Sequence, residues 1–230
     1  NVTICQGASQ QLTANATPAG SYQWLQGTTP VGSNSDKYSV TAAGAYRVVV
    51  TTSGGCVDTS TAVTVAVTPL PNISISPSQV SICEGQTATL TASGGATYSW
   101  SPSGGNQAVA NVAPLTSTTY TVTGTQNGCS NTATAQVTVN LLPTINVSGA
   151  GPQEICAGDS LILTASGTVG VSYEWKYNGV TAGTGSSFAA KAAGIYTVTG
   201  TVTATGCSIT PAPGTTLTVH PTPVAALAAG

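Results

Sequence analysis

The chain has 230 residues but only four Lys or Arg, six Asp or Glu and one His, and its formal net charge is −2. So few positive charges exclude the clustered Lys and Arg through which proteins bind nucleic acids or anionic membranes. Abundant Thr, Val, Gly and Ala, with no Met and a single Phe, predict an all-β protein with small side chains. Because no run of about 18 apolar residues occurs, we expect no membrane span.

A short block occurs three times along the chain, as ICQGASQQLTA (Ile4–Ala14), ICEGQTATLTA (Ile82–Ala92) and ICAGDSLILTA (Ile155–Ala165). A Tyr-x-Trp, a Tyr-x-Val and a Gly-Cys motif follow each block in the same order. The residues that recur are Cys5, Cys83 and Cys156; Tyr22/Trp24, Tyr98/Trp100 and Tyr173/Trp175; Tyr46/Val48, Tyr120/Val122 and Tyr196/Val198; and Cys56, Cys129 and Cys207. Such repetition predicts three similar modules of about 75 residues each.

Between these motifs the sequence alternates with a period of two residues, which is typical of half-buried strands. Gly54-Gly55 and Asn127-Gly128 lie just before a trailing cysteine and predict hairpin turns. Seven or so short strands per module, with Trp in the third and Tyr opening the sixth, predict tandem immunoglobulin-like β-sandwiches in an extended head-to-tail array. We predict four segments: repeat 1 at 1–68, lacking its own first strand, repeat 2 at 69–140, repeat 3 at 141–220, and a linker with the first strand of a following repeat at 221–230.

The Ile-Cys-x-Gly-x4-Leu-Thr-Ala, Tyr-x-Trp, Tyr-x-Val and Gly-Cys blocks cover nearly the whole chain and carry a resemblance. The sequence resembles the immunoglobulin-like or PKD-like repeats of large secreted adhesins of Bacteroidota, including those associated with gliding motility and type IX secretion. This resemblance implies a cell-surface location outside the cell and a non-catalytic role.

The six cysteines do not stand where an antibody domain places its inter-sheet disulfide. Leu12, Leu90 and Leu163 take the inner position of the second strand, and Val48, Val122 and Val198 take that of the sixth. Each leading cysteine precedes its Leu by about 20 Å of strand, toward one end of the sandwich, whereas each trailing cysteine follows the turn at the other end. That separation exceeds the Cα–Cα distance of a disulfide.

Two pairings remain open for these cysteines. In a head-to-tail array, Cys5 meets Cys129 and Cys83 meets Cys207 across the domain junctions, and we favour this pairing. The alternative pairs cysteines within each repeat, as Cys5–Cys56, Cys83–Cys129 and Cys156–Cys207. In either case, six cysteines in a nearly uncharged chain indicate an oxidising, extracellular setting.

The two junctions, Val67–Ser76 and Val139–Ser148, share a strand end, a short proline segment and a new strand, and the segment from Val219 begins the same way. Either the chain is one period of a longer polypeptide, which we favour, or Thr222–Gly230 inserts as a donated strand into the first domain of the next subunit. Both arrangements predict a fibre in which Cys56 and Cys156 find partners in neighbouring copies.

Residues for chemistry are scarce. His220 stands alone beside Pro221, and the acidic residues show no fixed spacing, so we expect no enzyme activity, no metal site and no cofactor. Trp24, Trp100 and Trp175, with Tyr46, Tyr120 and Tyr196, are predicted core anchors; sugar stacking on the Trp residues is the weaker interpretation. Asp159-Ser160-Leu161 matches the Bacteroidota O-glycosylation acceptor, which makes Ser160 a candidate glycosylation site.

The sequence therefore predicts a disulfide-stabilised structural segment of an extracellular fibre or adhesin stalk, with neighbouring copies of the same repeat as its partners. The alternative is a carbohydrate- or surface-binding adhesin module that takes surface glycans. Lys176–Phe188 is then the best candidate segment, because it departs most from the other repeats.

Overall fold

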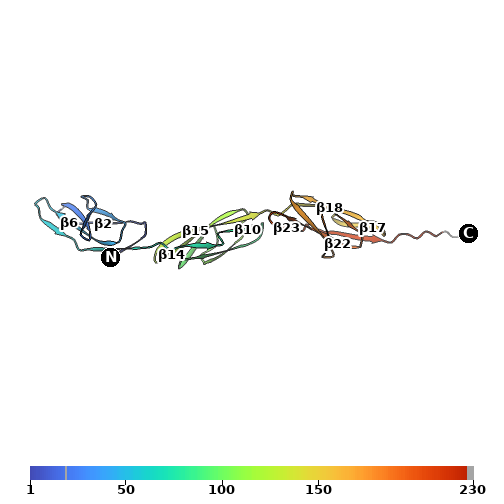
Figure 1. Ribbon diagram of the computed structural model, residues 1–230, viewed down its shortest axis with the longest axis horizontal. Coiled ribbons are helices and arrows are strands. Elements are labelled where there is room, and N and C mark those ends of the chain that lie inside the picture. Colours follow the sequence, from blue (N-terminus) through green and yellow to red (C-terminus); the bar gives the residue numbers. More distant parts are fainter. Residues whose placement is uncertain (19, 227–230) are drawn as a thin grey trace. The chain divides into compact units, whose positions relative to one another are not determined.

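The computed structural model describes residues 1–18 and 20–226, and every regular element within them is a β-strand (Figure 1). The chain packs as two compact units. The first contains Asn1–Ser78, Thr89–Val112 and Thr119–Gln136, and the second contains Gln79–Ala88, Ala113–Thr118 and the chain from Val137 onward. The first and third sandwiches each lie within one unit, and the strands of the second repeat divide between the two.

The first sandwich pairs a large sheet with a small one. The large sheet has the order β1-β8-β6-β3-β4, with β7 also paired to β6, and the small sheet contains only β2 and β5. β1 runs parallel to β8, whereas β2–β5, β3–β4, β3–β6, β6–β7 and β6–β8 are antiparallel pairs. The strands are β1 (Val2–Cys5), β2 (Gln10–Thr13), β3 (Ser21–Gln26), β4 (Thr29–Val31), β5 (Lys37–Val40), β6 (Gly44–Thr51), β7 (Val57–Thr59) and β8 (Val63–Thr68).

The second repeat forms one sheet in the order β10-β15-β14-β12 and another in the order β13-β11-β9. Its strands are β9 (Ser74–Ser76), β10 (Gln79–Cys83), β11 (Ala88–Ser93), β12 (Thr97–Ser101), β13 (Val109–Val112), β14 (Thr118–Gln126) and β15 (Cys129–Asn140). Asn127 and Gly128 both have positive φ, 52° and 77°, between β14 and β15. This two-residue turn confirms the predicted hairpin.

The third sandwich repeats the arrangement of the first with one strand more in its smaller sheet. Its sheets have the orders β17-β24-β22-β19-β20, with β23 on β22, and β16-β18-β21. The strands are β16 (Ile145–Ser148), β17 (Gly151–Cys156), β18 (Leu161–Gly167), β19 (Val171–Tyr177), β20 (Val180–Thr184), β21 (Ser187–Ala190), β22 (Gly194–Val202), β23 (Ser208–Ile209) and β24 (Thr215–His220).

The cores follow from the alternation of apolar residues in the strands. In each repeat the Trp is buried and lies opposite the Val of Tyr-x-Val, in the pairs Trp24/Val48, Trp100/Val122 and Trp175/Val198. Each indole N–H donates a hydrogen bond to a backbone carbonyl, of Ser35, Gln107 and Gly185 respectively, at 2.9 Å. Burial of the ring is therefore achieved without leaving its polar atom unpaired.

The hydroxyl of Tyr46 donates to the carbonyl of Ala42 at 3.0 Å, and that of Tyr196 donates to the carbonyl of Ala192 at 2.9 Å. A Tyr at this corner bonded to backbone just upstream is a mark of immunoglobulin-type sandwiches. The predicted all-β fold of tandem immunoglobulin-like sandwiches is confirmed. β8 ends at Thr68, β15 at Asn140 and β24 at His220, while the domain boundaries at 68, 140 and 220 remain predictions.

Candidate functional site: junction disulfides and an open groove

Cys5, at the end of β1, forms a disulfide with Cys129, at the start of β15, within the first compact unit. The S–S distance is 2.06 Å and the Cα–Cα distance is 5.6 Å. In the parallel β1–β8 pair Cys5 lies beside Thr68, and the Cys129 sulfur lies 3.9 Å from the carbonyl oxygen of Thr68. The bond therefore sits where the chain leaves the first sandwich and enters the second repeat.

Cys83, at the end of β10, forms the second disulfide with Cys207, which precedes β23, within the second compact unit. The Cα–Cα distance is 5.5 Å, and the Cys207 sulfur lies 3.9 Å from the carbonyl oxygen of Asn140, the last residue of β15. The backbone N–H of Glu84 donates to the same carbonyl at 2.9 Å. Each disulfide spans 124 residues and joins a leading cysteine to the trailing cysteine of the next repeat, as in the cross-junction pairing favoured from the sequence.

The two disulfides interleave, because Cys83 lies inside the loop that Cys5–Cys129 closes and Cys129 lies inside the loop of Cys83–Cys207. Between Cys5 and Cys207, the shortest covalent path crosses both bonds and follows only the chain between Cys83 and Cys129. Both proline junctions lie within disulfide-closed loops. Pairing within each repeat would instead leave each junction as a single covalent strand.

Cys56 and Cys156 are exposed and carry no disulfide in the part of the chain that the structure describes. They occupy the same two kinds of position as the bonded cysteines. Cys156 ends β17 and lies beside His220 in the parallel β17–β24 pair, just as Cys5 lies beside Thr68. Cys56 immediately precedes β7 and bonds to Thr52: its N–H donates to the Thr52 hydroxyl at 3.2 Å, and its carbonyl accepts from the Thr52 N–H at 2.9 Å.

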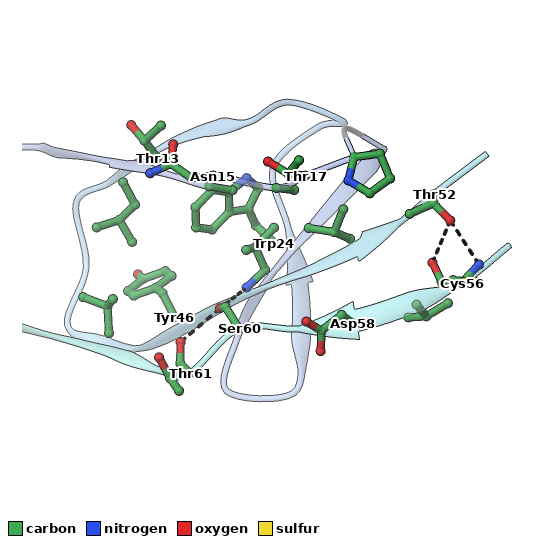
Figure 2. Close-up of a pocket in the computed structure, with 18 residues that line it drawn as sticks. Thr13, Asn15, Thr17, Trp24, Tyr46, Thr52, Cys56, Asp58, Ser60 and Thr61 are labelled. Atoms are coloured by element: carbon green, nitrogen blue, oxygen red, sulfur yellow. Dashed lines mark hydrogen bonds between the residues drawn. The ribbon is translucent and has the colours of Figure 1, made fainter. Parts of the chain in front are cut away.

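A groove with a volume of about 690 Å³ opens beside the core of the first sandwich. Figure 2 shows Thr13, Asn15 and Thr17 along one side of it and Thr52, Cys56, Asp58, Ser60 and Thr61 along the other, with Trp24 and Tyr46 between. Leu12, Val48, Val50 and Val63 complete an apolar floor. Trp24, Tyr46 and Val48 stay buried beneath the groove, whereas Leu12, Val50 and Val63 are partly exposed.

The groove contains few ionisable groups. Asp58 lines one side, and Tyr46 lies at its base with its hydroxyl bonded to Ala42. Burial raises the pKa of Tyr46 above its ordinary value of 10.0, with a smaller contribution in the same direction from Tyr38. No group of three metal-ligating side chains comes together among residues 1–18 and 20–226.

The other residues singled out from the sequence lie apart from the groove or in the cores. The predicted anchors Trp100, Trp175, Tyr120 and Tyr196 are buried, like Trp24 and Tyr46. Ser160 is exposed in the loop between β17 and β18. The exposed His220 places Nε2 3.1 Å from Oε2 of Glu154.

A second, shallower pocket of about 530 Å³ lies in the third sandwich. It is lined by Val171, Ser172, Tyr173, Glu174, Thr184, Gly185, Ser186 and Thr201. Three of these residues belong to the Lys176–Phe188 segment that the sequence indicated as a candidate binding segment. The pocket combines one Tyr ring with several hydroxyl groups.

Residues 221–226 follow β24 as exposed chain outside any strand (Figure 1). The first strand of a following repeat, expected in 221–230, falls partly on residues 227–230, which lie outside the described residues. The groove beside β2 was not predicted from the sequence. A detectable signal was Val50, which replaces the glycine found in the other two repeats.

No family model matches the sequence, and no curated protein is similar to it in sequence. Among solved structures, the chain is similar to the I67–I69 fragment of titin from the I-band, with a TM-score of 0.43 and 13% identity over 95% of each chain. It is also similar to extracellular domains 3–5 of Drosophila OTK, with a TM-score of 0.39 and 14% identity over 94% of this chain and 93% of that one. Three N-terminal domains of the outer capsid protein Hoc of bacteriophage RB49 give a TM-score of 0.39 and 15% identity over 94% and 95%.

The described residues contain no helix that could cross a membrane. Disulfides are typical of proteins in oxidising compartments. The chain thus combines tandem immunoglobulin-like sandwiches, two junction disulfides and one open groove.

Proposed function

We propose that this chain is a non-catalytic structural segment of an extracellular, cell-surface fibre or adhesin stalk, built to hold distance under tension. Copies of the repeat follow one another as a long filament, by continuation of the chain or by head-to-tail strand donation. The resemblance to repeats of secreted Bacteroidota adhesins supports this role, and so does the scarcity of groups for chemistry.

One observation carries the proposal: the interleaved pair Cys5–Cys129 and Cys83–Cys207. A sandwich pulled from its ends can unfold and release its whole length, but a disulfide stops the release at the bonded residues. Here the releasable chain between Cys5 and Cys207 is only the stretch of about 46 residues from Cys83 to Cys129, roughly 160 Å when extended. Without the bonds the same span, about 202 residues, extends to roughly 700 Å.

Single-molecule force spectroscopy tests the proposal on the whole chain held at its two ends. We expect the oxidised chain to extend by no more than about 160 Å between these cysteines, and the chain in reductant to extend toward 700 Å. The chain without added reductant is measured before and after alkylation of its free thiols as a control. Stepwise unfolding of the oxidised chain to its full length would contradict a role in holding distance under tension.

A second candidate function is carbohydrate binding by the third sandwich, favoured by the Tyr173 pocket. A Tyr ring beside Ser172, Ser186 and Thr201 hydroxyls offers one stacking surface and several hydrogen-bonding groups, as sugar sites do. Glycan-array binding by the whole chain that is lost in Tyr173→Ala would promote this function. Absence of binding at millimolar glycan would leave the structural role alone.

A further inference from the structure

The first sandwich has a free strand edge where the other repeats have a paired one. In the second repeat β9 lies antiparallel to β11, with Ile75 opposite Ala92, and in the third β16 lies antiparallel to β18, with Val147 opposite Ala165. The corresponding strand β2 pairs only with β5 in the part of the chain described. Its other edge borders the groove.

Beside the free edge of β2, the core of the first sandwich is partly open in the described part of the chain. Leu90 and Leu163 are fully buried, whereas Leu12, the matching residue of β2, is only half-buried. In the third sandwich, Ile145 and Val147 of β16 pack against a single core cluster that includes Leu163 and Trp175. In the first, the buried residues fall into two separate clusters, one around Tyr46 and one around Trp24. An apolar strand along β2 would close this gap.

The segment after β24 has the sequence of such a strand. Pro71 and Pro143 each precede an isoleucine by two residues: Ile73, which stands just before β9, and Ile145, which begins β16. Pro223 stands in the same relation to Ala225 and, like the other two, comes three residues after the end of a strand. Ala225 therefore takes the position of the isoleucines, and Ala226 the outward position of Ser74 and Asn146.

Side-chain sizes at one contact match this segment to the groove. Opposite the Tyr of Tyr-x-Trp lie Gly124 and Gly200 in the second and third repeats, and Val50 in the first. A Cβ on Gly124 would lie 2.2 Å from Cδ1 of Ile73, and one on Gly200 2.1 Å from Cδ1 of Ile145. A glycine is thus required beneath each isoleucine.

With Val50 lining the groove, an isoleucine strand is excluded and a smaller residue is required there. Replacing isoleucine with alanine removes side-chain carbons, and replacing glycine with valine adds the same number. The pair Ala225 and Val50 therefore conserves the volume of the Ile–Gly pairs. This match selects the segment after β24 over β9 or β16 of another copy.

The residues just after β2 match the corresponding residues of the third sandwich at one position and differ from them at another. In the third sandwich the Thr168 N–H and hydroxyl both bond to backbone atoms of Thr144, at 3.1 and 3.0 Å. Thr17 follows Ala14 in the sequence as Thr168 follows Ala165, and it lines the groove. It can therefore make the same hydrogen bonds to Val224 of the incoming segment. Ala16, however, replaces Gly167, where a Cβ would lie 1.9 Å from the Thr144 carbonyl oxygen. The incoming backbone must therefore stand farther from the corner, and the smaller Ala225 leaves room for this.

The cysteines give independent support. At both existing junctions the strand that enters the next repeat brings a leading cysteine against a trailing one, with Cα atoms 5.6 and 5.5 Å apart. A segment that leaves β24 beside Cys156 and enters the first sandwich brings Cys156 to Cys56 in the same way. Both thiols are exposed and free to react.

We propose that the groove of the first sandwich is the acceptor for Pro221–Ala226 of a second copy, with Ala225 seated on Val50 and the joint closed by a Cys156–Cys56 disulfide between copies. This deepens, and rests on, the filament proposed above. The bond forms when the two thiols exchange with a low-molecular-weight disulfide such as oxidised glutathione. The thiols lose two electrons and two protons in total, and the oxidant leaves as two reduced thiols.

The test uses the whole chain, incubated with oxidised glutathione and followed by light scattering and by non-reducing gels. We expect a ladder of disulfide-linked multimers whose peptide maps contain Cys56–Cys156. Ala225→Ile should slow ladder formation about tenfold or more, because the added carbons meet Val50. The matched control Ala226→Ile, at the outward position, should leave the rate within about twofold of the original.

The compensating double variant Val50→Gly with Ala225→Ile rebuilds the Ile–Gly contact of the other repeats. It therefore distinguishes a segment that no longer fits the groove from a chain that no longer folds. Recovery of the multimers supports the proposed register. Equal loss in Ala225→Ile and Ala226→Ile, or no Cys56–Cys156 ladder in the unaltered chain, would overturn it. The force measurement above concerns only Cys5–Cys129 and Cys83–Cys207 and stands whichever result is found.

Discussion

Removing the Cys5–Cys129 bond should destabilise the first sandwich by an amount that loop-closure entropy sets. The bond spans 124 residues, and a loop of that length corresponds to about 5 kcal/mol if everything inside it unfolds together. When the first sandwich unfolds alone, Cys129 stays near Thr68, so the loop shrinks to about 65 residues. Because the entropy grows only as the logarithm of length, the expected loss is still about 4 kcal/mol.

The assay is hydrogen exchange with mass spectrometry across a urea series, comparing the oxidised chain with the Cys5→Ser/Cys129→Ser variant. The amides of β6 report on the first sandwich, since this strand pairs with both β3 and β8. Their opening free energy should fall by about 4 kcal/mol, while those of β22 in the third sandwich stay unchanged. The control Cys56→Ser alters an exposed thiol and should stay within about 0.5 kcal/mol. A loss below about 1 kcal/mol in β6 would refute the reasoning.

Three further predictions follow from packing and ionisation. Leu163→Ala should cost about 3 kcal/mol in a urea titration and Leu12→Ala about half of that, because only Leu163 is fully buried; equal costs would argue against an open groove. Gly200→Val should lower stability by about 1–3 kcal/mol through its clash with Ile145, and Ile145→Ala in the same chain should recover most of the loss in thermal melts; no recovery would contradict the contact. The raised pKa of Tyr46 means that its stabilising contribution is complete below about pH 10 and is lost as pH rises toward the higher folded-state pKa, so Tyr46→Phe should flatten the alkaline stability profile; an unchanged slope would exclude Tyr46 as the cause.

Much of the fold could be predicted because the same pattern occurs three times along the chain, once in each repeat. The Tyr-x-Trp and Tyr-x-Val motifs place Trp24 opposite Val48, and the period of two residues then assigns the faces of the strands. The position of Cys5 seven residues before Leu12 puts it at the end of β1, away from the core. The alternation of apolar residues and the spacing of the motifs are local features of the chain, so both can be recognised in a single sequence.

The groove could not be read in the same way, because it depends on what lies beside β2. An unpaired edge and a half-buried Leu12 arise from the three-dimensional neighbourhood. The sequence shows that Val50 stands where the other repeats have glycine. The consequence of this difference becomes clear only from the contact between Gly124 and Ile73 in the structure. Glycosylation at Ser160 and the extracellular role remain predictions, and the exposed loop position of Ser160 leaves its hydroxyl accessible for modification.

Disulfide mapping tests the central claim, covalent linkage across the repeat junctions, most directly. An endoprotease that cleaves after Asp and Glu places every cysteine on its own fragment, because Asp36, Asp58, Glu84, Glu154 and Asp159 separate them. The non-reduced digest, kept acidic to prevent thiol exchange, should contain the fragment pairs Cys5–Cys129 and Cys83–Cys207. The pairs Cys5–Cys56, Cys83–Cys129 and Cys156–Cys207 would contradict it.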